Sequence, residues 1–161
     1  MFSYMILRGK VTQEQALLKI KHYCAYQERS HKEVMGKLYD LGLFKKEAEL
    51  LVAQLIEEGY LNEERFAIQF AGGRFRIKQW GKKKIEQALK EKQVSSYCIK
   101  KALAQIDEEP YRQTLQKLAT VKWTQLKGEK NIFIKKRKLQ DYLLQKGYEY
   151  ELVKAEVSGK E

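Results

Sequence analysis

A chain of 161 residues with 43% hydrophobic residues fits one compact domain or a few very small ones, and a single proline favours helices. No segment approaches the ~20 apolar residues of a membrane span, and the apolar start Phe2 to Leu7 is too short for a secretory signal. Two cysteines, Cys24 and Cys98, make no disulfide framework, so we expect reduced, half-buried thiols in a soluble cytoplasmic protein.

The first third of the chain carries the start and stop signals of three helices. Thr12 and Ser30 each precede a Gln or Glu by three residues, which is the capping-box pattern that opens a helix. The helix after Ser30 is expected to end at Gly42, a residue suited to a left-handed C-cap. A third helix is expected over about 45–58, ending at Gly59.

The same helical pattern recurs further along the chain. When the segments that close these helices are aligned, Gly42 corresponds to Gln93 and to Gly147, at offsets of 51 and 54 residues. Equivalent apolar residues, each four positions before a leucine, are Val34, Ile85 and Leu139. This register indicates an internal repeat of about three helices.

We therefore predict an all-α fold of three tandem three-helix, helix-turn-helix-like repeats, forming an elongated or crescent-shaped array. The expected boundaries are 10–59, 60–107 and 108–158. Asn62 is expected to cap the fourth helix, and Pro110 fits the first turn of a helix, where a backbone N–H is not needed.

The chain's positive charge is concentrated in one stretch. Segment 72–101 holds ten Lys or Arg residues against two Glu, within a total formal net charge of +11. Charge of this density predicts a polyanionic partner, and composition leaves open nucleic acid, an acidic membrane surface or an acidic protein groove. Apolar residues that a folded repeat could bury are interleaved with these charges: Phe75, Ile77, Trp80, Ile85, Leu89 and Ile99. The stretch is thus expected to be a face of a fold rather than a disordered tail.

Two basic clusters are the candidate binding sites. Arginine forks suit phosphate oxygens and lysines supply mobile point charges, while no base-reading pattern is visible, so we expect backbone-directed binding with weak sequence selectivity. The first basic cluster comprises Arg74, Arg76, Lys78, Lys82, Lys83 and Lys84, and the second comprises Lys135, Lys136, Arg137 and Lys138. By the repeat register the second cluster aligns with the opening of the fifth helix. Trp80 and Phe75 could stack on bases or fill the core.

Other chemistry finds little support in the sequence. The segment 81–83 lacks the first glycine and the hydroxyl of a nucleotide-binding loop, and His22 and Cys24 are two positions apart, pointing away from one another on a helix. Four carboxylates could serve a metal-dependent nuclease, or they could cap and flank helix ends: Glu57, Glu58, Glu63 and Glu64. We expect helix capping, no enzyme activity, no metal and no cofactor.

Several of these features together resemble the RecX family, the regulators of the RecA recombinase. The most specific part is the run 59–67, Gly-Tyr-Leu-Asn-Glu-Glu-Arg-Phe-Ala, supported by Arg29-Ser30, by Gly81 four residues before an isoleucine, and by Gly147. The resemblance extends from about Gln15 to Val157. The chain departs from the family pattern at Gln93, where a glycine is usual, and at 62–64, where Asn-Glu-Glu replaces the usual acidic pair.

The resemblance implies a non-enzymatic protein of DNA repair, homologous recombination and the SOS response. Such a protein binds the groove of the RecA filament on single-stranded DNA and modulates, usually inhibits, filament growth, ATPase and strand exchange. It also binds single-stranded and double-stranded DNA directly, and we expect it to be a monomer. The two basic clusters would supply its DNA or filament contacts. The alternatives are a stand-alone helix-turn-helix DNA-binding protein or transcription factor, and a metal-dependent nuclease.

Overall fold

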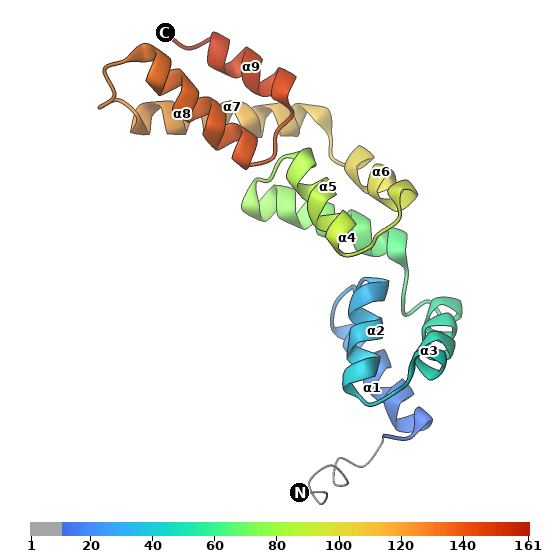
Figure 1. The fold of residues 1–161 in the computed structure, drawn as a ribbon. Helices are drawn as coiled ribbons and strands as arrows, with labels where there is room; N and C mark the ends of the chain where they lie inside the picture. The colour runs from blue at the N-terminus through green and yellow to red at the C-terminus, as the bar shows by residue number, and fades with distance from the viewer. Residues whose placement is uncertain (1–10) are drawn as a thin grey trace, which may run out of the picture. The chain divides into compact units, whose positions relative to one another are not determined.

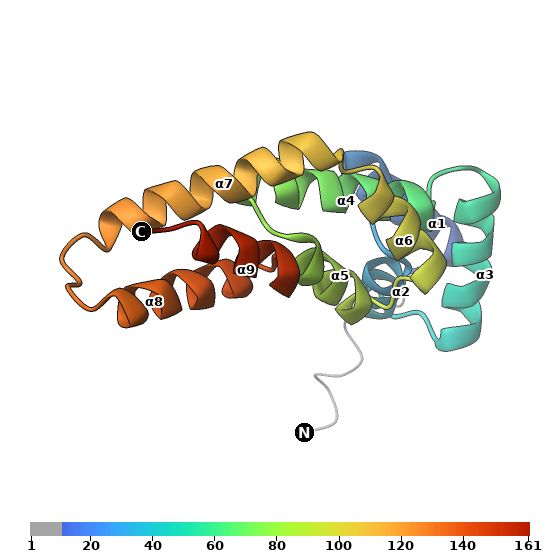
Figure 2. The same cartoon turned by 90° about the horizontal axis from the view of Figure 1, so that it is seen from above.

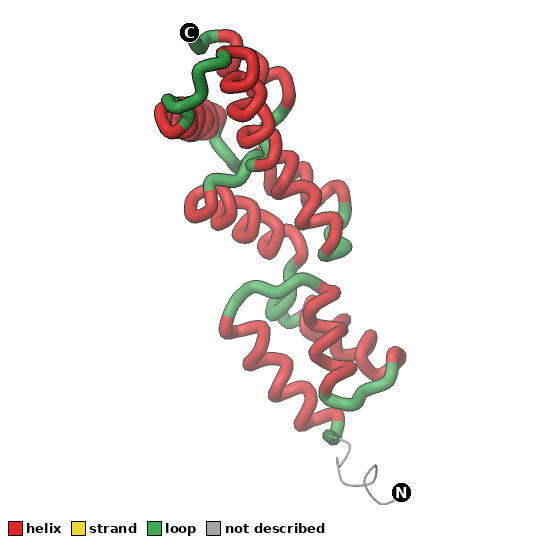
Figure 3. Tube along the Cα trace, turned by 60° about the vertical axis from the view of Figure 1, so that its left-hand side comes forward, coloured by secondary structure: helices red, strands yellow, loops and turns green. Residues whose placement is uncertain are grey.

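The computed structural model describes residues 11–161, and within that range the chain contains nine helices and no strand (Figure 1; Figure 3). The prediction of an all-α fold is confirmed. The apolar start Phe2 to Leu7 lies outside the described residues. None of the described helices is long and apolar enough to cross a membrane.

The nine helices follow one another as three tandem sets of three. They are α1 (Gln13–Tyr26), α2 (His31–Asp40), α3 (Lys45–Glu57), α4 (Glu63–Lys78), α5 (Lys82–Glu91), α6 (Ser96–Ala104), α7 (Glu108–Gln125), α8 (Ile132–Gln145) and α9 (Tyr150–Ser158). The chain divides into two compact units, one reaching Phe66 and including Lys92–Val94, the other comprising Ala67–Glu91 and Ser95–Glu161. The repeat boundaries at 10–59, 60–107 and 108–158 stay predictions.

Side-chain caps fix the helix starts in the first unit. Thr12 and Gln15 form a complete capping box, with backbone-to-side-chain hydrogen bonds of 3.1 and 3.2 Å in the two directions. The Ser30 hydroxyl accepts the backbone N–H of Glu33 at 3.1 Å, while the Glu33 carboxylate pairs with Lys92 at 2.7 Å. The second capping box therefore forms only on the hydroxyl side, whereas its acid pairs with Lys92 in the turn after α5.

Apolar side chains from α1, α2 and α3 make the core of the first unit, in which the three helices lie side by side (Figure 1). The predicted stripe residues Val34 and Leu38 of α2 are fully buried, as is Leu55 of α3. Full burial of a side chain of this size contributes about 1.5–3 kcal/mol relative to exposure. The remaining core residues are Ala16, Ile20, Cys24, Leu43, Ala48, Leu51 and Leu61.

The repeat register is confirmed in the second unit, where α8 and α9 run beside α7 (Figure 2). Ile85 of α5 and Leu139 of α8, aligned with Val34 in the sequence, are both 0% exposed. The same position is thus buried in all three repeats, because each repeat buries the same face of its middle helix.

Burial of the apolar residues in the basic stretch is confirmed only in part. Ile85, Leu89 and Ile99 are buried and Phe75 and Trp80 are half-buried, but Ile77 is 83% exposed. Ile77 lies two residues beyond Phe75, about 200° around α4, so it faces away from the side on which Phe75 packs. The prediction that Ile77 could be buried was wrong.

The turns that end the middle helices use the left-handed backbone region, as predicted. Gly42 has a φ of 92° and Gly147 a φ of 100°, and the aligned Gln93 has a φ of 60° without the freedom of a glycine. A residue with a Cβ is strained in this region by about 1–2 kcal/mol. Gln93 is therefore a site where the chain tolerates a small local cost.

Replacing Gln93 with glycine is expected to raise the free energy of unfolding by about 0.5–1 kcal/mol, because relief of the backbone strain outweighs the greater entropy of glycine in the unfolded chain. Urea unfolding followed by circular dichroism measures the change. The control is Gln87→Gly, at an exposed position inside α5, which is expected to lower stability by about 1 kcal/mol. Equal losses for both variants would show that Gln93 is not strained.

Candidate nucleic-acid interface

Trp80 lies at the centre of the first basic cluster. The guanidinium carbon of Arg74 is 5.5 Å from the centre of the indole ring, Lys78 Nζ is 5.9 Å from it, and Lys84 Nζ is 4.7 Å from it. These cations come from the end of α4 and the start of α5, so the turn between the two helices brings both basic runs to one ring. Each cation–π contact at such a site is worth about 0.5–1 kcal/mol, which offsets part of the repulsion between like charges.

The members of the first basic cluster differ in how much of the cation is free. Arg76, Lys78 and Lys83 are exposed. Arg74 is half-buried, with its guanidinium 4.6 Å from the Phe70 ring as well as near Trp80, and its Nε is buried without a hydrogen-bond partner among residues 11–161. Arg74 is thus held between two aromatic rings, whereas the three exposed cations can reach a ligand without rearrangement.

The turn before α5 packs directly on the turn after α8. Gly81 donates its N–H to the carbonyl of Lys146 at 2.8 Å, and Lys83 donates its N–H to the carbonyl of Gly147 at 2.9 Å. A Cβ at Gly81 would lie 2.3 Å from the Gly147 carbonyl carbon and oxygen, and one at Gly147 would lie 2.3 Å from Cβ of Lys84. The two glycines therefore let two backbones approach closely, and the approach fixes the position of the first turn of α5.

The same contact brings Lys146 to the first basic cluster. Its Nζ donates to the carbonyl of Lys78 at 3.1 Å, and the hydroxyl of Tyr148 donates to the carbonyl of Gln79 at 2.9 Å. Lys146 is not among the binding residues predicted from the sequence. Its position just before the repeat glycine Gly147 was visible, but only the packing of the α8–α9 turn on the end of α4 places it there.

Tyr111 of α7 contacts the first turn of α5 through a hydrogen bond. Its hydroxyl accepts the backbone N–H of Lys82 at 2.9 Å and donates to the carboxylate of Glu149 at 2.5 Å. Its ring is 2% exposed and packs against those of Phe75 and Tyr148, with centres 5.8 and 5.1 Å away. Burial, together with the hydrogen bond to Glu149, raises the pKa of Tyr111 well above its usual value. The phenol therefore stays protonated and keeps its donor.

Tyr111→Phe is expected to lower the free energy of unfolding by about 2–3 kcal/mol, because it leaves both the Lys82 N–H and the Glu149 carboxylate without a buried partner. Urea unfolding followed by tryptophan fluorescence measures this. Tyr97→Phe is the matched control, since Tyr97 is 63% exposed and its substitution is expected to change stability by no more than about 0.5 kcal/mol. If Tyr111→Phe lowered the free energy of unfolding by no more than the control does, the two hydrogen bonds of the Tyr111 hydroxyl would not stabilise the fold.

The same network predicts a loss of stability in alkali. Burial raises the pKa values of both Tyr111 and Tyr148 above 10.0, so above about pH 10 the unfolded chain releases these protons while the folded chain retains them. The contribution is fully present below that pH. As pH rises further, stability falls by up to about 1.4 kcal/mol per pH unit for each tyrosine. Tyr111→Phe should therefore show a shallower decline above pH 10 than the unsubstituted chain.

The second basic cluster starts one turn inside its helix. The side-chain oxygen of Asn131 accepts the N–H groups of Phe133 and Ile134 and caps α8, which begins seven residues before Leu139. By contrast, Lys82 opens α5 directly. The predicted alignment with the opening of the fifth helix holds in sequence register, but the cap at Asn131 lengthens α8 by about a turn, and the cluster does not lie at a helix start.

Individual members of the second basic cluster have different partners. Lys135 Nζ lies 4.0 Å from the centre of the Trp123 ring of α7. Lys138 pairs with Glu129 at 3.2 Å, and the Asn131 N–H and Lys138 lower the pKa of that carboxyl. Lys136 is half-buried and Arg137 is exposed. Arg137, the single guanidinium of this cluster, is therefore exposed, whereas the exposed Lys138 is paired with an acid.

Exposed apolar side chains accompany both basic clusters. Ile77, between Arg76 and Lys78, is 83% exposed, and Phe133, in the first turn of α8, is 82% exposed. Sequence periodicity does not predict that these two side chains are exposed, because apolar residues are usually assigned to a core. Both clusters thus present cations together with apolar groups.

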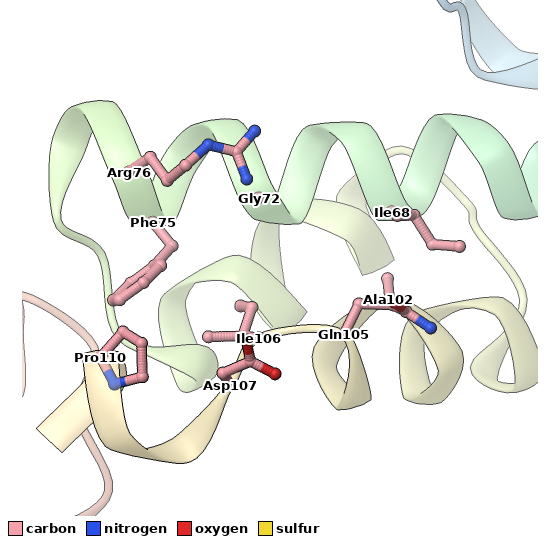
Figure 4. A pocket seen from close by; sticks show the side chains of 9 residues that line it. All are labelled: Ile68, Gly72, Phe75, Arg76, Ala102, Gln105, Ile106, Asp107 and Pro110. Carbon is pink, nitrogen blue, oxygen red and sulfur yellow. The ribbon is translucent and has the colours of Figure 1, made fainter.

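A groove beside Arg76 extends this surface between α4 and the α6–α7 connection (Figure 4). Its volume is about 350 Å³, and the residues that line it are Ile68, Gly72, Phe75, Arg76, Ala102, Gln105, Ile106, Asp107 and Pro110. The Arg76 guanidinium lies along α4 over Gly72, where an added Cβ would meet Nη1 at 2.7 Å (Figure 4). The small residue at Gly72 therefore lets Arg76 lie flat at the rim of this groove.

The residues weighed for other chemistry have structural partners or are dispersed. Cys24 and Cys98 are free thiols and are buried rather than half-buried, and burial raises the pKa of Cys24. Glu58 pairs with Lys21 at 2.9 Å, which lowers the pKa of the Glu58 carboxyl. Asn62 accepts the N–H of Arg65 at 2.9 Å and caps α4 as predicted. Within residues 11–161, no group of three or more His, Cys, Asp or Glu side chains is placed to hold a metal ion.

Two parts of the chain match the RecX family. Residues 62–103 match the second three-helix domain of RecX, and residues 109–156 match the third. The first range contains the whole first basic cluster, and the second range contains the whole second cluster.

Curated relatives and a solved structure agree with this match. The regulatory protein RecX of Oceanobacillus iheyensis is 29% identical over 144 residues, which cover 89% of this chain and 53% of that protein. RecX of Clostridium perfringens strain 13 is 33% identical over 124 residues, 76% of this chain and 58% of that protein. The chain thus spans between half and three fifths of the length of these relatives. The crystal structure of RecX from Lactobacillus salivarius shares the fold with a TM-score of 0.82 at 20% identity, covering 91% of this chain and 94% of that one.

Proposed function

Because this chain belongs to the RecX family, we propose that it regulates RecA by binding along the groove of the filament that RecA forms on single-stranded DNA. Binding there limits filament growth, ATP hydrolysis and strand exchange. The chain also contacts DNA directly, through the first and second basic clusters, and acts without catalysis of its own.

The observation that carries this proposal is the uncompensated charge around Trp80. Within residues 11–161, no carboxylate pairs with a cation of the first basic cluster. Two of the four other lysines in the same stretch are paired with acids instead, Lys90 with Glu86 at 3.0 Å and Lys92 with Glu33 at 2.7 Å. These acids therefore lie beside lysines outside the cluster, and the cluster keeps its full charge for phosphate oxygens.

The apolar groups beside the cations favour a filament over naked DNA. Ile77, between Arg76 and Lys78, and Phe133, one helical turn before Arg137, are each more than four fifths exposed, and phosphate contacts alone give no reason to expose them. Protein interfaces bury apolar groups at their centre and charged groups at the rim. A groove lined by both DNA phosphates and protein side chains accommodates both kinds of residue.

The test is the rate of ATP hydrolysis by RecA on single-stranded DNA, with this chain added below the RecA concentration. We expect a lower rate and, by direct imaging, shorter filaments. An unchanged rate and length would refute the proposal. A stand-alone transcription factor would instead bind one DNA sequence about 10³-fold or more above random DNA.

A further inference from the structure

A shallow hollow on the first unit lies between α1 and α2, away from both basic clusters in the sequence. Three cations, Lys19, Arg29 and Lys37, and two tyrosines, Tyr23 and Tyr26, line it, and no carboxylate does. Lys19, Tyr23 and Tyr26 are spaced four and three residues apart on α1, so they share one face of that helix.

Arg29 is fixed in this hollow by its contacts with Tyr23. Its Nε donates to the Tyr23 carbonyl at 3.0 Å, and its guanidinium carbon lies 3.7 Å from the centre of the Tyr23 ring. These contacts use Nε and one face of the guanidinium, which leaves the two Nη groups as donors. A guanidinium held in place loses little entropy on binding a phosphate, and its forked donors match two phosphate oxygens.

The acids that could neutralise the hollow are occupied elsewhere in the same unit. Glu28, next to Arg29 in the chain, pairs with Arg65, and Glu33, one turn before Lys37 on α2, pairs with Lys92 at 2.7 Å. The Lys37 ammonium lies 5.7 Å from the Tyr23 ring. The hollow therefore keeps a concentrated positive charge, which attracts an anion.

Tyr26 supplies a second recognition element. Its ring, at the end of α1, is 84% exposed, so it contributes almost nothing to the core. It lies 6.0 Å from the Arg29 guanidinium carbon, within reach of a nucleotide whose phosphate binds that arginine. Unpaired bases of any sequence stack on exposed aromatic rings. Asp and Glu side chains have no flat ring that could stack on Tyr26 in this way.

We propose that this hollow is a separate binding site for single-stranded nucleic acid, with a phosphate on Arg29, Lys19 and Lys37 and an unpaired base stacked on Tyr26. The proposal rests on the direct DNA contact included in the proposed function but not on RecA, so it is tested with DNA alone. Base stacking requires an unpaired strand, which makes single strands the preferred ligand over duplex.

Two measurements on the full chain test the site. The first is photo-crosslinking to a thymidine oligonucleotide that carries 5-iodouracil, followed by mass spectrometry of the adduct. We expect an adduct at Tyr26. The second is fluorescence anisotropy of a labelled oligonucleotide, in which Tyr26→Ala is expected to weaken binding on the order of 5-fold or more.

The charge contribution is tested by salt dependence. Lys19→Gln combined with Lys37→Gln should reduce the slope of log affinity against log salt by about 1.4, since each lost contact to a single strand removes about 0.7. The control with the same charge change is Lys45→Gln with Lys46→Gln, on exposed positions of α3 in the same unit. We expect this control to change the slope less.

Three results would overturn the site. One is a control pair as weakened as the hollow pair, which would mean that only overall charge matters. Another is unchanged affinity for Tyr26→Ala with no Tyr26 adduct. The third is binding of a polyglutamate peptide to the hollow, together with unchanged oligonucleotide binding when the hollow residues are substituted. That result would assign the hollow to an acidic protein. If the chain failed to inhibit RecA but still formed the Tyr26 crosslink, only the proposed function would be refuted, and the site would stand.

Discussion

Gly81→Ala is expected to lower the free energy of unfolding of the second unit by about 3 kcal/mol, in the upper range for overpacking. The new Cβ would lie 2.3 Å from the carbonyl carbon and oxygen of Gly147. Both groups are backbone, so no side chain can rotate away to make room. The substitution must separate the two turns and lengthen the hydrogen bond from Gly81 N–H to the Lys146 carbonyl, now 2.8 Å.

Urea unfolding followed by tryptophan fluorescence reports on this unit alone, because both tryptophans of the chain, Trp80 and Trp123, lie in it. The matched control is Gly73→Ala inside α4, where an added Cβ meets nothing within 4 Å. There alanine is expected to stabilise the helix by up to about 1 kcal/mol. Opposite signs for two identical substitutions are the expected result; equal effects would show that the turn accommodates a side chain.

Gly81→Ala should also weaken DNA binding. The contact between the two turns fixes the first turn of α5, from which Lys83 and Lys84 extend, and it places Lys146 beside Lys78. Separation of the turns would spread the cations that now share the Trp80 ring. A lower affinity at unchanged net charge would therefore indicate that the arrangement of the cluster matters, and not only its total charge.

Local signals in the sequence predicted much of this structure. A capping hydroxyl, a left-handed glycine and an apolar repeat act over one or two turns, so Thr12, Gly42 and the buried face of Ile85 could be read from their neighbours. The repeat register then extended the prediction to three helix sets. Asn131 was missed as a cap, although it is a residue type that favours this position.

What the sequence could not show depends on contacts between distant segments. Tyr111 supports Lys82 across 29 residues, and Lys146 reaches Lys78 across 68. No periodic pattern encodes such pairs, because each is set by how two helices pack. The pairing of Lys92 could not be predicted for the same reason, because its partner Glu33 lies 59 residues earlier in the chain.

The combined substitution of Lys82, Lys83 and Lys84 by alanine is expected to reduce affinity for single-stranded DNA on the order of 10-fold or more at low salt. The slope of log affinity against log salt should fall by about 2, because each of the three lost phosphate contacts contributes about 0.7 to it. Fluorescence anisotropy across a salt series measures both quantities.

The fold should survive this substitution. Alanine keeps the backbone N–H of residue 82 that the Tyr111 hydroxyl accepts, and it keeps the Cβ of residue 84 that faces Gly147. The cation–π contacts that Lys82 and Lys84 lose and the like-charge repulsion that the substitution relieves oppose one another, so the expected change in stability is within about 1 kcal/mol. The control is alanine at Lys90, Lys100 and Lys117, three exposed lysines of the second unit outside the cluster. If the control lost as much affinity, the first basic cluster would not be the binding face.

The same two variants separate DNA contact from RecA contact. If the cluster binds DNA within the filament, inhibition of RecA ATP hydrolysis should weaken in parallel with affinity for naked DNA, and the control should inhibit normally. Ile77→Ser is expected to weaken inhibition of RecA and to leave the affinity for naked DNA unchanged. The reason is that an exposed apolar side chain contributes to a protein interface rather than to phosphate binding. Retained DNA affinity with weaker inhibition would then assign the apolar part of this surface to RecA, and the cations beside it to the DNA.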